Sequence, residues 1–443
     1  MIFCNAFSLL SIAALLGVAQ STSVIDSLVS DTLAEWEGIG LTAWSVDSQA
    51  NVCTLGISGE RIRGSGQLLQ TTGDSRHHVG SVTKSMTASL LAILIQQGHL
   101  PYGWNTTMAQ VIPEATDGPY ENVTLRELTG MISGMDNIPP QDIEFPPFDP
   151  EDLRSFRKAV AVAAVNYPPV HPPGTAYLYS NWAFITAGHV IETITEMVWE
   201  GALGTYLFEP LDIDLGDDMA QFVGAPNNDR DPWGHQGFDP CDPSIDECDN
   251  PSVLGPAGTF SGPVAAMATY FAWHLACHNG QHTTLLPQAA CQEIHQPADP
   301  TVSAYGYGWV CYDHSEVEGR VCTHNGSNLF NYYNVTLSFA RGKAYTGYAN
   351  AASRPEMQNA LMVNQVVGSL FDLNHDAEEC TVPFTSSFYI NQPTTQPSDI
   401  PSSMDSPSEA PSVEPTSSAP GVLWTGSLLT ASFLSFLLLF HVA

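Results

Sequence analysis

The chain has 443 residues, and its 46 acidic residues against 13 basic ones give a formal net charge of −33. A surface this acidic repels nucleic acid and anionic membranes, so we exclude nucleic-acid binding and interpret the charge as a solubility feature. The length is sufficient for one large enzyme domain or two smaller domains.

The first residues form an apolar run that ends in small and polar side chains. This pattern predicts a secretory signal peptide over residues 1–22, although the usual basic start is missing. A membrane anchor or a buried helix is the alternative, but the run is short for a membrane span. Residues 23–385 are then the predicted globular domain.

The far end of the chain has two parts. Residues 386–420 are rich in Pro, Ser and Thr and poor in large apolar side chains, which predicts a disordered, extended stalk. Residues 421–443 are an apolar tail that follows small residues and has no basic residue after it. This pattern favours a glycolipid-anchor signal, with a spanning helix as the alternative. Either reading predicts a secreted or surface protein whose only membrane contact is this tail.

Apolar periodicity within the globular domain predicts strands at both ends and helices between them. In chain order, the expected elements are two antiparallel strands within 38–62, a helix over 81–98, a short helix in 123–135, helices at 151–165, within 172–199 and at 262–277, β-strands between 305 and 350, and a helix within 354–371. This order predicts an α/β (α+β) fold in which an antiparallel sheet, built from both chain ends and flanked by helices, carries a helical insert.

Eight cysteines remain after Cys4 leaves with the signal peptide, and an even count in a secreted chain suggests disulfides. Eight cysteines allow 105 connectivities. Proximity in the sequence favours Cys241–Cys248, Cys277–Cys291 and Cys311–Cys322, which leaves Cys53–Cys380. The carboxylates of residues 239–250 are an alternative calcium site, but EF-hand spacing is absent, and we predict neither a metal nor a cofactor.

Lys84 is one of three lysines in the chain, and it stands inside the apolar helix one turn after Ser81. Residues i and i+3 share a helix face, so the two side chains are expected to meet. Burial lowers the pKa of a lysine amine, and a neutral amine can accept the hydroxyl proton of Ser81. The alternative is a chance spacing in which Lys84 extends to solvent.

Two further motifs follow in order: "YSN" at 179–181 and "HNG" at 324–326. Together with "SVTK" at 81–84, they resemble the Ser-x-x-Lys, Tyr-x-Asn and His-x-Gly elements of the serine β-lactamase-like, penicillin-recognising enzymes, especially the class C branch. The resemblance covers roughly residues 24–372. One departure is Met131, at a position where the family commonly has His.

The resemblance implies a role for each matched residue. Ser81 would form an acyl-enzyme, with Lys84 and Tyr179 sharing the proton transfers, and the Lys84 ammonium would lower the Tyr179 pKa toward a phenolate base. The predicted substrate-binding residues are Asn181, His324, Gly326 and Ser327, the last through a backbone N–H in the oxyanion hole. Without the family context, Tyr179 would be interpreted as a buried aromatic residue and Asn181 as a helix cap.

The third motif also narrows the predicted substrate. His324 replaces the lysine usual in β-lactamases, and a neutral imidazole is less suited to an anionic substrate. We therefore expect a serine hydrolase for small esters or amides. The alternatives are β-lactamase or D-stereospecific peptidase activity, acyl transfer, or a catalytically silent binding protein on the same fold.

Sequons at four asparagines predict N-glycosylation of the exported chain. Asn105, Asn122 and Asn334 are the candidate sites. Asn325 is expected to stay unmodified, because a glycan there would block the predicted cleft.

Overall fold

The computed structural model describes residues 24–137, 152–213, 215, 231–243, 248–282, 284–315, 317, 319–352, 358–373, 380 and 382–383. All of them belong to the first of two units, residues 1–388. The predicted signal peptide, stalk and apolar tail lie outside the described residues.

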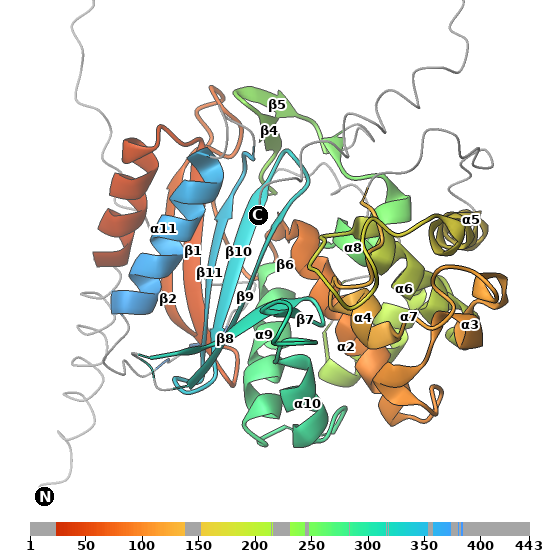
Figure 1. The fold of residues 1–443 in the computed structure, drawn as a ribbon. Helices are drawn as coiled ribbons and strands as arrows, with labels where there is room; N and C mark the ends of the chain where they lie inside the picture. The colour runs from red at the N-terminus through yellow and green to blue at the C-terminus, as the bar shows by residue number, and fades with distance from the viewer. Residues whose placement is uncertain are drawn as a thin grey trace, which may run out of the picture. The chain divides into compact units, whose positions relative to one another are not determined.

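A large antiparallel sheet forms the centre of this unit (Figure 1). Its strands, in spatial order, are β12 (Val382–Pro383), β2 (Asn51–Gly59), β1 (Gly40–Asp47), β11 (Lys343–Ala349), β10 (Tyr332–Ser338), β9 (Gly319–Ser327), β8 (Trp309–His314) and β7 (Tyr305–Gly306). β1 pairs with β11 along its whole length, from Leu41 opposite Ala349 to Asp47 opposite Lys343. The sheet therefore combines both ends of the domain, and this confirms the predicted fold class.

Helices cover both faces of the sheet. A helix over residues 24–35 and α11 (Gln358–Leu373) lie on one face, where Val29 and Val363 share a buried cluster with Leu41 and Tyr345. The buried positions of α11 recur at intervals of three and four residues, as expected of a helix with one face on a sheet. On the other face, α9 (Val264–His278) packs against β1 and β11.

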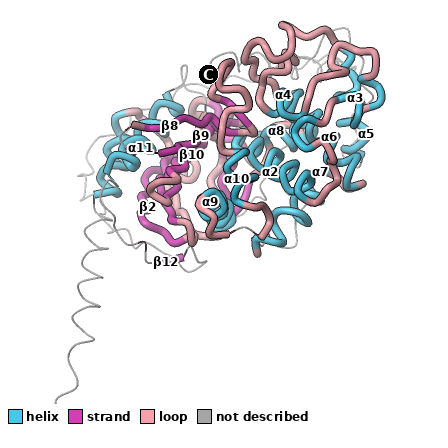
Figure 2. The backbone as a smooth tube through the Cα atoms, turned by 60° about the horizontal axis from the view of Figure 1, so that its bottom comes forward, coloured by secondary structure: helices cyan, strands magenta, loops and turns pink. Residues whose placement is uncertain are grey.

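The remaining helices form a group beside the sheet (Figures 1 and 2). They are α2 (Thr83–Gln96), α3 (Met108–Val111), α4 (Leu125–Thr129), α5 (Leu153–Asn166), α6 (Asn181–Thr195), α7 (Trp199–Leu203), α8 (Gly255–Gly258) and α10 (Gln288–Ile294). Two short strand pairs complete the unit: β3 (Arg76–His78) with β6 (Ser261–Pro263), and β4 (Gly234–Gln236) with β5 (Asp239–Cys241). α2 is buried along nearly its whole length, because α6, α7, α8 and α10 pack around it rather than one layer.

The expected elements and the observed ones differ mainly at their ends. The helix predicted over 81–98 is a 3-10 turn, Gly80–Val82, followed by α2, and the helix over 24–35 was not predicted. The structure contains the three disulfides that proximity favoured, Cys241–Cys248, Cys277–Cys291 and Cys311–Cys322, and the remaining pair, Cys53–Cys380. Within the described residues, no helix combines the length and apolar character needed to cross a membrane.

Candidate active site

Ser81 lies in the 3-10 turn that leads into α2, and its side chain is 7% exposed. Gly80 has a φ of +53°, in the left-handed region that glycine tolerates. Thr83 fixes the turn, because its hydroxyl donates to the Gly80 carbonyl oxygen and accepts from the Phe260 N–H. The turn therefore holds Ser81 at the start of a buried helix.

The Lys84 side chain is fully buried, and its Nζ has three polar neighbours. These are Ser81 Oγ at 3.1 Å, Asn181 Oδ1 at 2.7 Å and the Ala257 carbonyl oxygen at 2.6 Å. Burial holds the Lys84 pKa well below its usual value. Lys84 is thus dehydrated and directed at the Ser81 hydroxyl, not extended into solvent.

Tyr179 contacts the same hydroxyl from another side. Its OH lies 2.7 Å from Ser81 Oγ, and the Lys84 Nζ is 4.7 Å from the centre of its ring. The expectation that Lys84 would lower the Tyr179 pKa is wrong. Burial raises the Tyr179 pKa, and this outweighs the lowering by its hydrogen bond to Ser81.

The partners of Lys84 define its hydrogen positions. A neutral amine has two N–H bonds and one lone pair, whereas Asn181 Oδ1 and the Ala257 carbonyl can only accept. When Lys84 is protonated, Nζ donates to Ser81 Oγ as well; when it is neutral, both N–H bonds are directed at these two oxygens and the lone pair faces Ser81 Oγ. In the neutral form the Ser81 O–H can donate to Lys84, while the Tyr179 O–H donates to Ser81.

Asn181 is the first residue of α6, but it does not cap the helix. Ser180 is the N-cap, and its hydroxyl accepts from the Ala183 N–H at 3.0 Å. The Asn181 side chain is therefore free to accept from Lys84, while its backbone N–H donates to Asn137 Oδ1 at 2.7 Å. The N-cap thus directs the neighbouring amide side chain into the site.

Two glycines bring β9 against the nucleophile turn. A Cβ on Gly326 would lie 2.1 Å from the Val79 carbonyl oxygen and 2.4 Å from the Ser81 nitrogen, and one on Gly80 would lie 2.2 Å from the Ser327 nitrogen. The backbones of Ser81 and Ser327 are therefore adjacent, as the two N–H donors of an oxyanion hole must be.

His324 lies on the same strand segment as Gly326. β8 pairs only with residues 319–323 of β9. From His324 onward, β9 therefore has a neighbouring strand on one side only, which is β10. The His324 Nε2 lies 3.1 Å from the Tyr305 hydroxyl. Burial, with the neighbouring Lys84, lowers the His324 pKa to about 3, so the imidazole is neutral at ordinary pH.

The reason for expecting Asn325 to stay unmodified does not hold. Alternate residues of a strand face opposite sides of a sheet. His324 faces the site, and the exposed Asn325 instead donates to the Tyr332 hydroxyl at 2.8 Å, next to the helix layer that contains α11. Blocking of the cleft is therefore no reason for Asn325 to stay unmodified, and its glycosylation state stays a prediction.

The other sequon asparagines lie on segments that contribute no residue to the site. Asn105 and Asn122 are exposed, whereas Asn334 is half-buried and donates to Asn364 Oδ1 at 2.6 Å. Asn334 stands directly opposite Asn325 in the β9–β10 pairing. Glycosylation of these residues stays a prediction.

Several residues of the site were not predicted. The Ala257 carbonyl and Asn137 are backbone or loop partners with no motif to mark them. Met131, noted only as a departure from the family, accepts the Ser180 N–H on its sulfur at 3.2 Å and so supports the "YSN" segment. Among the described residues, no group of three or more His, Cys, Asp or Glu side chains is arranged to hold a metal ion.

The antiparallel sheet with flanking helices, and a serine contacted by a buried lysine and a tyrosine, define a β-lactamase/transpeptidase-like protein. The Beta-lactamase family model matches residues 36–369, and the chain belongs to this family. The match confirms the family that the three sequence motifs predicted.

Individual relatives agree with this assignment. An unguisins hydrolase, ungD', of Aspergillus campestris is 25% identical over 378 residues, a match that covers 79% of this chain and 65% of that relative's length. Penicillin-binding protein 4 of Amycolatopsis lactamdurans is 27% identical over 63% of this chain and 73% of its own. The D-amino acid amidase of Ochrobactrum anthropi has the same fold, with a TM-score of 0.60 at 17% identity over 81% of this chain and all of its own.

Proposed function

We propose that this protein is a serine hydrolase that cleaves small esters or amides through an acyl-enzyme on Ser81. The observation that carries the proposal is the double contact on the Ser81 hydroxyl, from the buried amine of Lys84 at 3.1 Å and from the Tyr179 phenol at 2.7 Å. One neighbour can take a proton from the nucleophile while the other can give a proton to the leaving group.

In the acylation step, Ser81 Oγ attacks the substrate carbonyl carbon and its proton passes to Lys84 Nζ. The carbonyl oxygen becomes an oxyanion beside the Ser81 and Ser327 amides. The bond from the carbonyl carbon to the leaving nitrogen or oxygen then breaks, and the Tyr179 phenol protonates the departing atom. The acyl-enzyme is left with a Lys84 ammonium next to a Tyr179 phenolate.

Deacylation reverses these roles. The phenolate of Tyr179 takes a proton from water, which attacks the acyl carbon, and Ser81 Oγ leaves with the proton held by Lys84. The product acid departs, and all three side chains return to their starting protonation states. The order fits the raised pKa of Tyr179 and the lowered pKa of Lys84, because each group begins the cycle neutral.

The surroundings of the third motif favour an uncharged substrate. His324 has its pKa lowered to about 3 and contacts the Tyr305 hydroxyl, so it offers no positive charge to a substrate carboxylate. The aromatic pair Tyr177 and Tyr305, with ring centres 5.8 Å apart, adds apolar surface beside it. We therefore propose neutral esters and amides as better substrates than anionic lactams.

The relatives support hydrolysis over a silent scaffold, since one of them is named as a hydrolase. We also propose that the protein is exported, with residues 421–443 as the signal for a glycolipid anchor or, alternatively, as a membrane span. Four disulfides support an oxidising compartment. Expression in eukaryotic cells, with and without a phosphatidylinositol-specific phospholipase, tests the attachment: release by the lipase indicates a glycolipid anchor.

The catalytic proposal is tested with residues 23–385 purified from a secretory host. A panel of p-nitrophenyl esters, D- and L-amino acid p-nitroanilides and a chromogenic cephalosporin is compared between wild type and Ser81→Ala. We expect ester or amide turnover that is abolished in Ser81→Ala, and a mass increase on Ser81 after reaction with a fluorophosphonate. Equal rates in the two proteins across the panel would overturn the proposal.

A further inference from the structure

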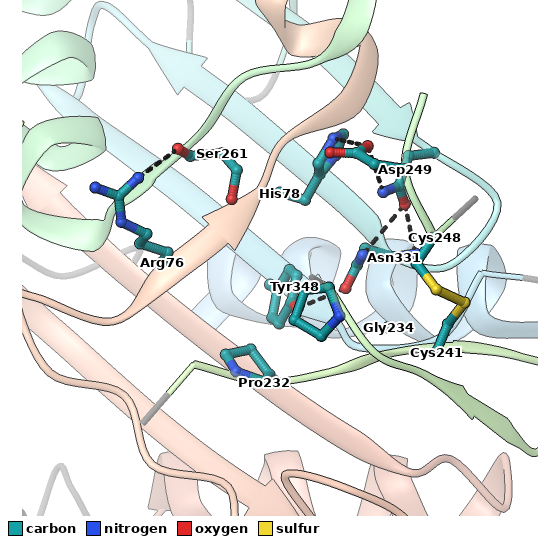
Figure 3. A pocket seen from close by; sticks show the side chains of 12 residues that line it. Arg76, His78, Pro232, Gly234, Cys241, Cys248, Asp249, Ser261, Asn331 and Tyr348 are labelled. Atoms are coloured by element: carbon teal, nitrogen blue, oxygen red, sulfur yellow. Dashed lines mark hydrogen bonds and ion pairs between the residues drawn. A yellow bond between two sulfur atoms is a disulfide. The ribbon is translucent and has the colours of Figure 1, made fainter. Parts of the chain in front are cut away.

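A buried hydrogen-bonded network lies behind the nucleophile turn and includes none of the catalytic side chains. It begins at His78, three residues before Ser81, on the short strand β3. The Gly80 N–H donates to His78 Nδ1 at 3.1 Å, so Nδ1 is an acceptor and the ring hydrogen is on Nε2. His78 Nε2 then contacts Asp249 Oδ1 at 2.8 Å, with both side chains at least nine-tenths buried (Figure 3).

Asp249 connects this turn to the other half of the oxyanion hole. Its Oδ1 also accepts from Asn328 Nδ2 at 2.9 Å, and Asn328 directly follows Ser327. Burial alone would raise the Asp249 pKa, but His78 and the hydrogen bonds outweigh it and lower the pKa, so the carboxylate stays ionised. One carboxylate oxygen thus joins the segment that carries the Ser81 amide to the segment that carries the Ser327 amide.

The next residue reaches the support of Lys84. Asn250 Nδ2 donates to the Gly258 carbonyl oxygen at 2.6 Å, and Gly258 follows Ala257, whose carbonyl accepts from Lys84. The segment Cys248–Asn250 therefore contacts residues next to the Ser81 turn, next to Ser327 and next to the Ala257 carbonyl that accepts from Lys84. The Cys241–Cys248 disulfide fixes its start, next to a cavity of about 30 Å³, which is large enough to hold water (Figure 3).

We propose that Cys248–Asn250, held by the Cys241–Cys248 disulfide, is a positioning unit that keeps the two oxyanion-hole amides in register through His78 and Asn328. The inference rests on the proposed function, since it concerns the same oxyanion hole. Gly80 needs such support because its φ of +53° is a conformation that it can leave at little cost. A shift of about 1 Å in one donor can lower the rate by roughly 10²-fold.

The test uses substitutions that break one link at a time. In His78→Asn the amide oxygen can replace Nδ1 and keep the Gly80 contact, but the link to Asp249 is lost. In His78→Gln the amide nitrogen can replace Nε2 and keep the Asp249 link, but the Gly80 contact is lost. Asn328→Asp retains the oxygen that accepts from the Phe330 and Asn331 N–H groups, but replaces the donor to Asp249 by a carboxylate oxygen and so turns this link into a repulsion.

Matched controls separate positioning from general destabilisation. His274→Gln alters another buried, hydrogen-bonded histidine that lies outside the network. The double replacement Cys241→Ser/Cys248→Ser is compared with Cys277→Ser/Cys291→Ser, which removes a disulfide that does not contact the network. Thermal unfolding of every variant is recorded, and rates are measured where each is folded.

The readouts are kcat, KM and the inhibition constant of a boronic acid, whose tetrahedral adduct on Ser81 places an oxygen in the oxyanion hole. We expect the three network variants and Cys241→Ser/Cys248→Ser to lower kcat/KM by about 10- to 100-fold with KM changed less than about 2-fold. The boronate inhibition constant should rise by the same factor, and both controls should stay within about 2-fold of wild type.

The proposal is overturned if kcat/KM falls while boronate binding is unchanged, or if His78→Asn retains full activity, because Asp249 would then have no part. A wild type that reacts with no substrate or fluorophosphonate would refute the proposed function instead. Hydrogen exchange at the Gly80, Ser81 and Ser327 amides then decides the positioning: faster exchange in the network variants supports it, and unchanged exchange overturns it.

Discussion

Replacing Lys84 with Met tests the central feature of the site, because methionine fills the space of the aliphatic side chain without an amine. A general base contributes about 10²- to 10⁴-fold to a rate. We therefore expect kcat/KM to fall by that factor, which corresponds to about 2.7–5.4 kcal/mol of lost transition-state stabilisation. The loss should appear mainly in the acylation step, where Ser81 transfers its proton.

The cost to folding should be smaller than the cost to catalysis. In Lys84→Met, Asn181 Oδ1 and the Ala257 carbonyl each lose a donor, at about 1–3 kcal/mol for a buried acceptor. Removal of a buried amine offsets part of this penalty. A net loss below about 3 kcal/mol is less than the 5–15 kcal/mol of a typical domain, so the variant stays folded at 25 °C.

Stopped-flow measurement of ester acylation across pH provides the assay. Lys84 acts as a base in its neutral form, so the wild-type rate should rise with pH through the Lys84 pKa, at a pH well below that of an ordinary lysine. This rise should disappear in Lys84→Met. Lys158→Met, at a half-exposed surface lysine, is the control and should match wild type.

Two results would refute the reasoning about Lys84. One is a folded Lys84→Met that acylates within about 10-fold of wild type, since a general base cannot be worth so little here. The other is a pH rise that persists unchanged in the variant, because the titrating base would then be another group.

Three further predictions concern packing, acid stability and glycosylation. Gly326→Ala should destabilise the fold by about 1–3 kcal/mol and lower activity, because the new Cβ would clash with the Ser81 backbone. Gly368→Ala in α11, where the space is open, should instead stabilise the fold by about 0.5–1 kcal/mol. Urea denaturation and ester turnover test both variants. Burial lowers the His274 pKa from 6.5 to about 3, so the unfolded chain binds the extra proton and stability falls as the pH drops from about 6.5 toward 3. In His274→Gln the pH slope of the unfolding free energy should therefore decrease by about 1.4 kcal/mol per pH unit in that window, and an unchanged slope would contradict this. Asn325→Gln should leave kcat/KM within about 2-fold, whatever glycopeptide mapping shows at that residue, and a larger loss would mean that this side chain does reach the site.

The predictable parts of the site were those encoded by local spacing. Ser81 and Lys84 are three residues apart on a helix, so periodicity alone brings them together. The Tyr179 pKa could not be predicted in the same way, because its direction is set by burial of the phenol, and that depends on elements distant in the sequence. The orientation of the Asn325 side chain was predictable from the sequence, because neighbouring residues of a strand face opposite sides of the sheet and His324 faces the site.

The hydrogen-bonded network around Asp249 could not be predicted from the spacing of residues in the sequence. His78 and Asp249 are far apart in the chain and belong to no shared motif, and they meet only because β3 pairs with β6 and a disulfide fixes Cys248. The helix over residues 24–35, by contrast, has a local signal, because Ile25, Val29 and Leu33 recur every four residues.

The joining of strands from both ends of the domain has a consequence during synthesis. Ser81 and Lys84 leave the ribosome early, whereas Ser327 and its neighbours on β9 emerge only after the helical region is complete. A growing chain thus carries the Ser81 hydroxyl and Lys84 before it contains the Ser327 N–H that would stabilise the negative charge on the substrate oxygen. Activity should arise abruptly, when the late strands dock beside β1, and prematurely terminated chains should be inert.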